Sequence, residues 1–414
     1  MTPDVQRYLG RQVARGSWCL QGRLPDHPSG AVVIPSLAEG SELFETLDSL
    51  DRCSHELRHR FAVVVVVNRS AGDSDAEKTN QDDLQALHAR CETVKLPLAW
   101  VDASSGELAL PERDAGVGLA RKLGFDLLLQ ERPGIEDVAV LASLDADTRV
   151  EATYLSALVG HFSASPAPGC ALPFRHRDSE NPAENMVIER YELYLRAYVE
   201  GLRSAGSPYA FHTVGSAMAC SVKGYLAAGG MSRRRAAEDF YFLQQLAKVG
   251  GVETLHGTTV YPSSRASRRT PLGTGQVVAR ELAGEDVVRF FAPEGFVLLG
   301  RWLTLVSHSR ELAGAEILDQ SAGLNPELAG FLAGAGLVEA WDRIKANSRT
   351  AKQFYRAFHT WFDALKTVQF LHAVEVCWPR SSDPAYVARQ MGWEGGLTVG
   401  MLLSRMRSLQ GVPV

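Results

Sequence analysis

Residues 61–67 read FAVVVVV, and this run decides the fold class. A continuous β-branched run of this length is typical of a strand buried on both faces, as in a parallel sheet. Similar runs alternate with helical patterns along the chain. The further expected strands are 31–35, 96–101, 138–144, 217–222 and 252–260, and the expected helices are 39–50, 82–92, 114–130, 185–202 and 238–249. This alternation predicts an α/β domain with a mostly parallel sheet flanked by helices.

The last third of the chain has a different pattern. Strand signals fade after residue 281 and helical patterns dominate. Five of the seven tryptophans lie there, which indicates a packed region rather than a disordered tail. We therefore expect an N-terminal extension over 1–29, an α/β domain over 30–280 and an all-helical region over 281–414. The helical region could cover a substrate or form a homodimer contact, and the sequence leaves both open.

Composition narrows the class of protein without naming an activity. The 414 residues carry 43 Lys and Arg against 48 Asp and Glu, a net charge of −5. This balance disfavours nucleic-acid binding, which needs an excess of positive charge. No stretch of ~20 apolar residues predicts a membrane span, and residues 1–21 lack the apolar run of a signal peptide. The six cysteines form no CxxC pair, so we expect reduced thiols and a cytoplasmic protein.

A pair of carboxylates follows one of the expected strands, in the sequence LDADT at 144–148. In open α/β sheets, ligands bind beyond the carboxyl ends of the strands. Asp145 and Asp147 could share a divalent cation there, and oxygen ligands suit Mg²⁺ or Mn²⁺. The alternative is a simple turn in which Asp147 caps the next helix.

A second acidic pair, Glu238 and Asp239, stands at the start of an expected helix, after a flexible Gly229-Gly230 loop. The alternative is that the helix dipole alone favours acids there. Residues 254–280 contain no Asp or Glu. The segment carries Arg265, Arg268, Arg269 and Arg280, together with Gly273 and Gly275. Such a loop suits a diphosphate, although it could also be an ordinary exposed loop.

Taken together, these segments resemble the family 2 glycosyltransferases of the GT-A fold. The resemblance rests on 33–35 with Glu39, on 144–147, on 229–230 followed by 238–239, and on a Gly-rich helix start at 113–125. It covers residues 30 to 275, and the motifs occur in the order of the family. It implies a metal-dependent enzyme that moves a sugar from a nucleotide-diphosphate donor, UDP- or GDP-linked, to a hydroxyl acceptor.

The resemblance also implies roles for single residues. Asp239 is the expected general base, and Glu238 either positions the acceptor or tunes Asp239. A single displacement by such a base inverts the anomeric centre, and the sequence leaves a retaining outcome open. Asp145 and Asp147 hold the metal. The expected donor-binding residues are Pro35, Glu39, Asn68, Asp73, Arg113, Arg121, Asp145, Arg265, Arg268 and Arg269. The expected acceptor or sugar pocket comprises His212, Gly215, Ser216 and Gly230, although His212 could equally be a structural histidine.

Two departures from the family pattern refine this expectation. After the valine run the family has an acidic pair and Gly-Ser, where this chain has Asn68 and Asp73 as stand-ins. The QxxRW motif of the processive, membrane-bound synthases is missing, as are transmembrane helices. Both absences favour the addition of a single sugar over polymerisation.

Three other classes of protein remain as alternatives. A sugar nucleotidyltransferase would carry Arg or Lys in a Gly-rich loop after the first strand, and residues 35–40 contain neither. A non-catalytic nucleotide-sugar-binding protein would not need both acidic pairs. A glycoside hydrolase uses two carboxylates but needs no diphosphate loop.

Overall fold

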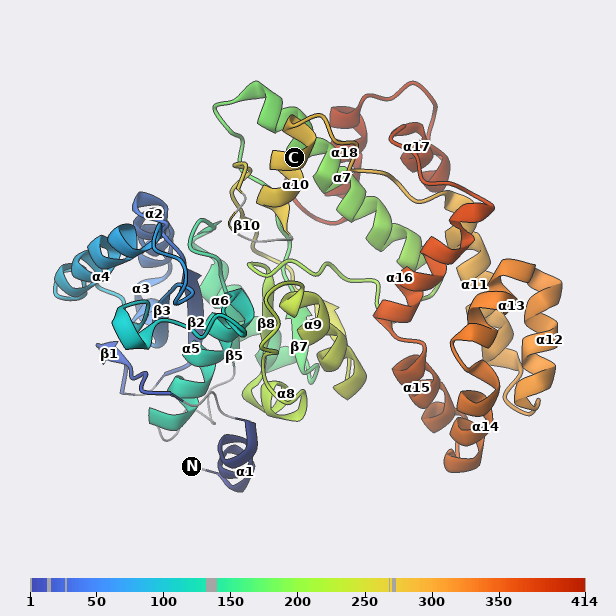
Figure 1. Cartoon of the computed structure of the whole chain (residues 1–414), viewed down its shortest axis with the longest axis horizontal. Helices are drawn as coiled ribbons and strands as arrows, with labels where there is room; N and C mark the ends of the chain where they lie inside the picture. Colours follow the sequence, from blue (N-terminus) through green and yellow to red (C-terminus); the bar gives the residue numbers. More distant parts are fainter. Residues whose placement is uncertain are drawn as a thin grey trace. The chain divides into compact units, whose positions relative to one another are not determined.

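The computed structural model describes residues 2–12, 16–26, 28–131, 140–267, 269 and 273–413. The chain forms two compact units (Figure 1). The first unit, which is α/β, takes Met1–Ile188, His212–Ala279 and Arg407–Val414, and the second, which is helical, takes Glu189–Phe211 and Arg280–Met406. The fold class expected from the sequence is confirmed: an α/β sheet structure is followed by a helical region.

The α/β unit is built on an eight-stranded sheet in the order β1-β4-β3-β2-β5-β8-β7-β9. Its strands are β1 (Gln21–Gly22), β2 (Gly30–Ser36), β3 (Phe61–Asn68), β4 (Leu98–Ala103), β5 (Val140–Ser143), β7 (Gly169–Ala171), β8 (Met218–Cys220) and β9 (Val252–Thr254). The four strands β4, β3, β2 and β5 are parallel to one another, whereas β1 is antiparallel to β4 and β8 is antiparallel to β5. Every residue of β3 is buried, as the valine run predicts.

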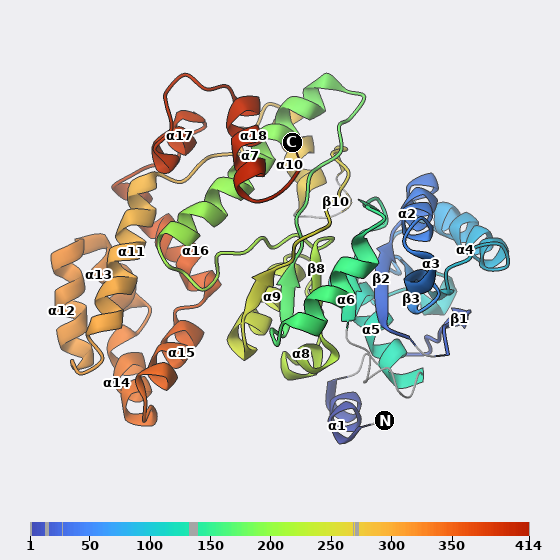
Figure 2. The ribbon, with the colours of Figure 1, turned by 180° about the vertical axis from the view of Figure 1, so that it is seen from behind.

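Helices flank this sheet (Figures 1 and 2). They are α1 (Pro3–Gln12), α2 (Ser41–Asp51), α3 (His55–Arg58), α4 (Glu77–Cys91), η1 (Gly106–Leu108), α5 (Val117–Glu131), α6 (Tyr154–Ala164), α8 (Val222–Ala227) and α9 (Glu238–Val249). Helix α5 packs on β2 and β3. The contact is close at Gly124, since an added Cβ would lie within 3.1 Å of the side chain of Val66, so glycine lets the helix approach the sheet.

The strand order reverses direction at β2, and such a reversal is a common place for a ligand site. From β2 the chain runs outward through β3 to β4, and it then returns to the other side of β2 as β5. In open α/β sheets, ligands bind beyond the carboxyl ends of the strands at such a reversal. The residues that follow β2 and β5 are therefore the first candidates for a site.

A two-stranded ladder brings a distant loop to the same place. Strand β6 (Arg149–Val150) follows the 145–148 turn and pairs antiparallel with β10 (Val260–Tyr261). The expected strand 252–260 is thus two strands, β9 and β10, that lie in different sheets. This pairing brings the Arg-bearing segment after residue 261 alongside the 145–148 turn. Of the expected strand 138–144, residues 138 and 139 lie outside the described residues.

The helical unit packs around tryptophans and phenylalanines. Its helices are α11 (Pro293–His308), α12 (Gly314–Leu324), α13 (Pro326–Gly334), α14 (Leu337–Asn347), α15 (Ala351–Trp361), α16 (Ala364–Ala373), η3 (Val374–Val376) and α17 (Ala385–Met391). Trp302 and Trp341 are fully buried, and the ring centroids of Trp341 and Phe354 are 4.8 Å apart. Helices α7 (Pro182–Ser204), α10 (Thr274–Leu282) and α18 (Val399–Leu409) contribute residues to both units. No helix among the described residues combines the length and the apolar character that crossing a membrane requires.

Candidate active site

The turn after β2 presents a carboxylate at the reversal point. Glu39 follows Ala38, whose φ is +51°. The turn is tied to α4, because the Ala38 N–H donates to Asn80 Oδ1 (2.8 Å) and the Gly40 N–H donates to Asp83 Oδ2 (3.3 Å). Asn80 and Asp83 are buried. Sequence reasoning missed both, and the available signal was a polar pair three residues apart on one helix face.

Two arginines from the segment after β10 hold Glu39. Arg265 pairs with Glu39 through Nη2, and Arg269 Nη2 lies 3.0 Å from Glu39 Oε1. Arg269 also donates to the carbonyls of Leu37 and Ala38. Both arginines are about one-third exposed, so they are accessible to a ligand.

The turn after β5 presents the second carboxylate pair. The Thr148 N–H donates to the Asp145 carbonyl (3.1 Å), which closes the turn. Asp147 Oδ2 lies 3.2 Å from Arg265 Nη2, so one guanidinium joins Asp147 to Glu39. Burial, together with the charges of Glu39 and Asp145, raises the pKa of Asp147 to about 7, although Arg265 and Arg269 oppose the shift. Asp147 precedes a strand and caps no helix.

Arg121 connects the two acidic pairs. It lies in α5 with only 2% of its side chain exposed, and it pairs with Asp145 through Nη2 and with Glu238 through Nη1. Burial alone would lower its pKa, but the nearby carboxylates of Asp145, Glu238 and Asp239 raise it. Gly215 makes room for this guanidinium, since a Cβ there would lie 3.0 Å from Arg121 Cζ.

Glu238 and Asp239 form the first turn of α9. The preceding Ala237 is left-handed, with φ +58°, a conformation that is costly for an L-residue other than glycine. Burial and the charge of Glu238 raise the pKa of Asp239 to about 7, while Arg121 and the Phe240 N–H (2.7 Å from Oδ1) oppose the shift. Glu238 is buried, whereas Asp239 is half-buried.

The structure also locates the other donor-side residues predicted from the sequence. Asn68 is buried, and its side-chain amide lies 3.2 Å from the carbonyls of Ser36 and Val66. Asp73 Oδ1 accepts from the N–H groups of residues 75 and 76, which stabilises the turn before α4. Arg113 is exposed in the turn before α5. Pro35 lies within the fully buried β2, and Arg268 lies outside the described residues.

The predicted acceptor residues occupy different surroundings. His212 Nε2 lies 3.0 Å from Gln410 Oε1, and its ring meets Phe174 edge-on at 5.0 Å. Ser216 is buried, and its hydroxyl has no hydrogen-bond partner among the described residues. Gly230 is left-handed, with φ +75°, and a Cβ there would clash with the hydroxyl of Tyr8.

One further basic residue at the site was missed. Arg177 Nη2 donates to Glu42 Oε2 (2.7 Å) and to the Asp147 carbonyl (3.0 Å). It therefore links the 145–148 turn to helix α2. No motif surrounds it in the sequence, because its role depends on the folding of a loop after β7 onto the turn after β5.

The carboxylates suit a divalent cation that is completed by substrate. Burial raises the pKa of Asp147 most, the charges of Glu39 and Asp145 raise it further, and a bound cation would offset these charges. Within the described residues, no group of three or more His, Cys, Asp and Glu side chains could hold a metal. If Asp145 and Asp147 bind a cation, they would supply two protein ligands at most, and the remaining oxygens would come from other molecules such as water.

Comparisons with known proteins give distant structural likenesses only. No protein-family model matches the chain, and no curated protein matches it. A structure of the mannosyltransferase PcManGT from Pyrobaculum calidifontis in complex with GDP-Man and Mn²⁺ is 15% identical, covers 90% of this chain and 92% of its own, and has a TM-score of 0.38. The structure of S. aureus TarS 1–349 in complex with UDP-GlcNAc is 13% identical, with coverages of 88% and 93% and a TM-score of 0.38. Because these TM-scores are below 0.5, the interpretation of the site depends on its own residues.

Proposed function

We propose that this protein is a metal-dependent glycosyltransferase that moves one sugar from a nucleotide-diphosphate donor to a hydroxyl acceptor. One observation carries the proposal: Arg121 joins Asp145, from the turn after β5, to Glu238, from the start of α9. We therefore treat the two acidic pairs as parts of one site, although Asp147 and Glu238 are 91 positions apart in the sequence. A transferase needs both parts, since one stabilises the leaving group and the other removes the acceptor proton.

The leaving diphosphate would lie over the turns after β2 and β5. Asp145 and Asp147 would hold a divalent cation, which supplies Lewis-acid stabilisation of the departing phosphates. Arg265 and Arg269 would exchange their present partners, Glu39 and Asp147, for phosphate oxygens, which match the guanidinium fork. The donor's nucleoside would extend toward the end of β3, near Asn68 and Asp73.

Asp239 would accept the proton of the acceptor hydroxyl. As the hydroxyl oxygen attacks the anomeric carbon, its proton passes to the Asp239 carboxylate, and the bond from that carbon to the diphosphate oxygen breaks with its electron pair. A direct displacement of this kind inverts the anomeric centre. A pKa of about 7 suits a base at neutral pH. Glu238, held by Arg121, would position the acceptor.

A binding screen tests the donor half of this proposal. Thermal unfolding would be followed with nucleoside diphosphates and their sugars, with and without Mn²⁺. We expect one nucleotide to raise the Tm in a Mn²⁺-dependent way, and we expect Asp147→Asn to lose that dependence. Asp319→Asn, on an exposed position of α12, is the matched control for the change of charge. An unchanged metal dependence in Asp147→Asn would contradict the metal assignment.

A second reaction mixture distinguishes the proposed transferase from the main alternative, a sugar nucleotidyltransferase. A sugar nucleotidyltransferase would consume a sugar phosphate and a nucleoside triphosphate and release diphosphate. We expect no diphosphate from that mixture, whereas a nucleotide sugar together with its acceptor releases the nucleoside diphosphate. Formation of a nucleotide sugar from the first mixture would overturn the proposal.

A further inference from the structure

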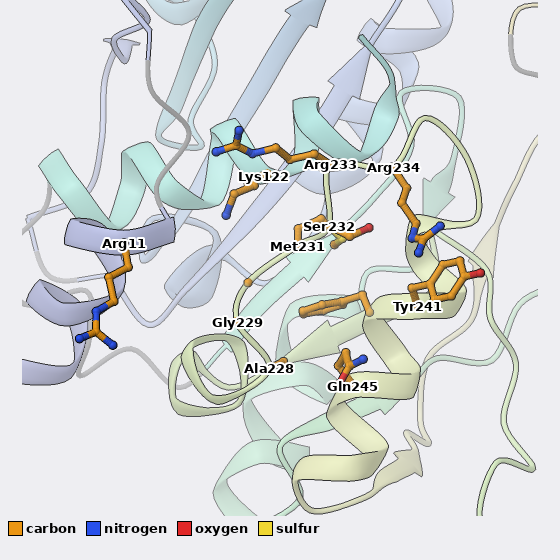
Figure 3. Close-up of a pocket in the computed structure, with 12 residues that line it drawn as sticks. Arg11, Lys122, Ala228, Gly229, Met231, Ser232, Arg233, Arg234, Tyr241 and Gln245 are labelled. Carbon is orange, nitrogen blue, oxygen red and sulfur yellow. The ribbon is translucent and has the colours of Figure 1, made fainter. Parts of the chain in front are cut away.

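A cavity of the α/β unit lies beside the Gly229-Gly230 loop, and its lining is basic. Its volume is about 670 Å³, and its lining includes Arg11, Lys122, Ser232, Arg233 and Arg234 (Figure 3). We propose that this cavity binds the phosphate group of a small molecule, separately from the proposed donor site. The inference rests on the residues of the cavity and does not require the proposed glycosyl transfer.

The charges of the lining have one sign. Arg11 comes from α1, Lys122 from α5, and Arg233 and Arg234 from the loop before α9. Among the described residues that line the cavity, none is Asp or Glu. Figure 3 shows these basic side chains distributed around the loop, with Arg11 and Arg234 at opposite ends. Arginines bind phosphate oxygens through paired N–H groups, so such a lining selects an anion with several oxygens.

Lys122 is the buried member of this set, with 3% of its surface exposed. Its Nζ lies 2.6 Å from the Tyr8 hydroxyl and 3.1 Å from Asp126 Oδ2. Burial lowers the pKa of Lys122, Asp126 opposes that effect, and the positive charge of Arg233 lowers the pKa further. Lys122 is thus paired inside the protein, and the exposed Arg11, Arg233 and Arg234 supply the positive charge that favours an anion over a neutral ligand.

The remaining polar groups of the cavity are also arranged for a ligand. The Ser232 hydroxyl is buried, and no hydrogen-bond partner for it occurs among the described residues. Arg234 stacks on the ring of Tyr241 with its Cζ 3.8 Å from the ring centroid, which orients the guanidinium plane. Gly229 and Gly230 both have positive φ, so the loop curves along the cavity without side chains that would fill it.

The cavity is separate from the proposed donor site but adjacent to the first turn of α9, which carries Glu238 and Asp239. It shares no lining residue with the set of Glu39, Asp147, Arg265 and Arg269. The same loop that lines it packs on the first turn of α5, since a Cβ at Gly118 would lie 2.7 Å from the Ser232 carbonyl oxygen. The phosphate could therefore belong to an acceptor that reaches the site or to a separate effector.

Titration with inorganic phosphate tests the inference. Binding would be measured calorimetrically on a variant with Arg265→Ala and Arg269→Ala, which removes both arginines assigned to the donor diphosphate. We expect saturable binding that becomes at least ~10-fold weaker when Arg233→Ala and Arg234→Ala are added, because two charge-assisted contacts are lost. The matched control is Arg235→Ala, an exposed arginine of the same loop outside the lining, which should change binding less than about twofold.

Several outcomes decide the matter. If Arg235→Ala weakens binding as much as the paired change, the attraction is diffuse and the cavity is not a site. If the paired change has no effect, the inference is wrong. Should the paired variant fail to fold, Arg11→Ala on a different helix provides the second test, with an expected weakening of about threefold.

Donor hydrolysis by the wild-type protein then identifies the source of the phosphate. An effector site predicts that phosphate changes the rate of donor hydrolysis, whereas an acceptor subsite predicts inhibition only of transfer to the acceptor.

Discussion

Two ion clusters of the α/β unit use the same chemistry in different surroundings. The Arg121 cluster comprises Arg121, Asp145 and Glu238, and the Arg265 cluster comprises Arg265, Arg269, Glu39 and Asp147. In the first, the Arg121 and Glu238 side chains are 2% and 5% exposed. In the second, the Arg265 and Asp147 side chains are 34% and 23% exposed. Buried charges keep their partners, whereas exposed ones exchange them at little cost, which fits the proposal that the first cluster holds the site in place and the second receives the ligand.

The two clusters differ because their arginines lie in different kinds of secondary structure. Arg121 lies in the second turn of α5, a helix packed on the sheet, and its guanidinium lies against Gly215. Arg265 and Arg269 lie in a segment between β10 and α10 that has no regular secondary structure where it is described. A helix orders its side chains before a ligand arrives, while a loop can adjust to one.

The largest expected effect comes from breaking the buried cluster. Arg121→Met leaves Glu238 buried without its cation, and we expect the free energy of unfolding to fall by about 3–5 kcal/mol. Arg265→Met removes an arginine that is about one-third exposed and should cost less than about 1 kcal/mol. Urea denaturation of both variants measures the difference. Equal losses would mean that burial does not distinguish the two clusters.

The acid limb of the pH–rate profile gives the next largest effect. Since the pKa of Asp239 is raised to about 7, its carboxyl is protonated below that pH and cannot accept a proton. We expect kcat/KM to fall about 10-fold per pH unit below 7, or about 100-fold at pH 5. The profile is measured at saturating Mn²⁺ so that Asp147 remains ionised. A rate that stays constant down to pH 5 would assign the base elsewhere.

Asp147 makes stability depend on pH. Its pKa in the folded protein, about 7, is above the ordinary value of 3.8, so its contribution to stability is present below the ordinary value and is lost as the pH rises toward 7. Asp147→Asn carries no charge, and in metal-free buffer we expect it to be about 1 kcal/mol more stable than the wild type at pH 8. The gain should vanish near pH 4. Tm measurements at the two pH values test this, and a gain independent of pH would contradict it.

The smallest effect concerns the backbone before Glu238. Ala237 is left-handed, which costs roughly 1 kcal/mol for alanine and nothing for glycine, so Ala237→Gly should stabilise the protein by about 0.5–1 kcal/mol. Ala236→Gly is the control, because residue 236 is not among the residues of positive φ and the substitution there should destabilise. Guanidinium denaturation of both variants gives the comparison. A loss of stability in Ala237→Gly would show that the left-handed turn stores no strain.

The sequence predicts the sheet well and the ion partners poorly. The valine run identifies β3 because a strand covered on both faces needs apolar residues throughout, and the turn after β5 carries the expected carboxylates. The bridge from Asp145 through Arg121 to Glu238 depends on long-range packing of α5 and α9, which no local pattern encodes.

Local sequence patterns also fail to predict three other features of the α/β unit and of helix α7. The segment 252–260 has one continuous strand pattern, yet β9 and β10 join different sheets, because the pairing partner decides the sheet. Asn80 and Asp83 look like surface polar residues of α4, and only the turn that carries Glu39 makes them buried partners. An amphipathic helix such as α7 likewise does not reveal which unit will cover its apolar face.

The release of nucleoside diphosphate from a nucleotide sugar, with acceptor and Mn²⁺ present, tests the central claim most directly. The claim is that Asp239 accepts the acceptor proton while the 145–147 turn supports the leaving diphosphate. The account predicts steady release by the wild type and by Asp319→Asn, and release about 10²–10⁴-fold slower by Asp239→Asn, with nucleotide binding retained. Near-normal release by Asp239→Asn with the donor bound would contradict it.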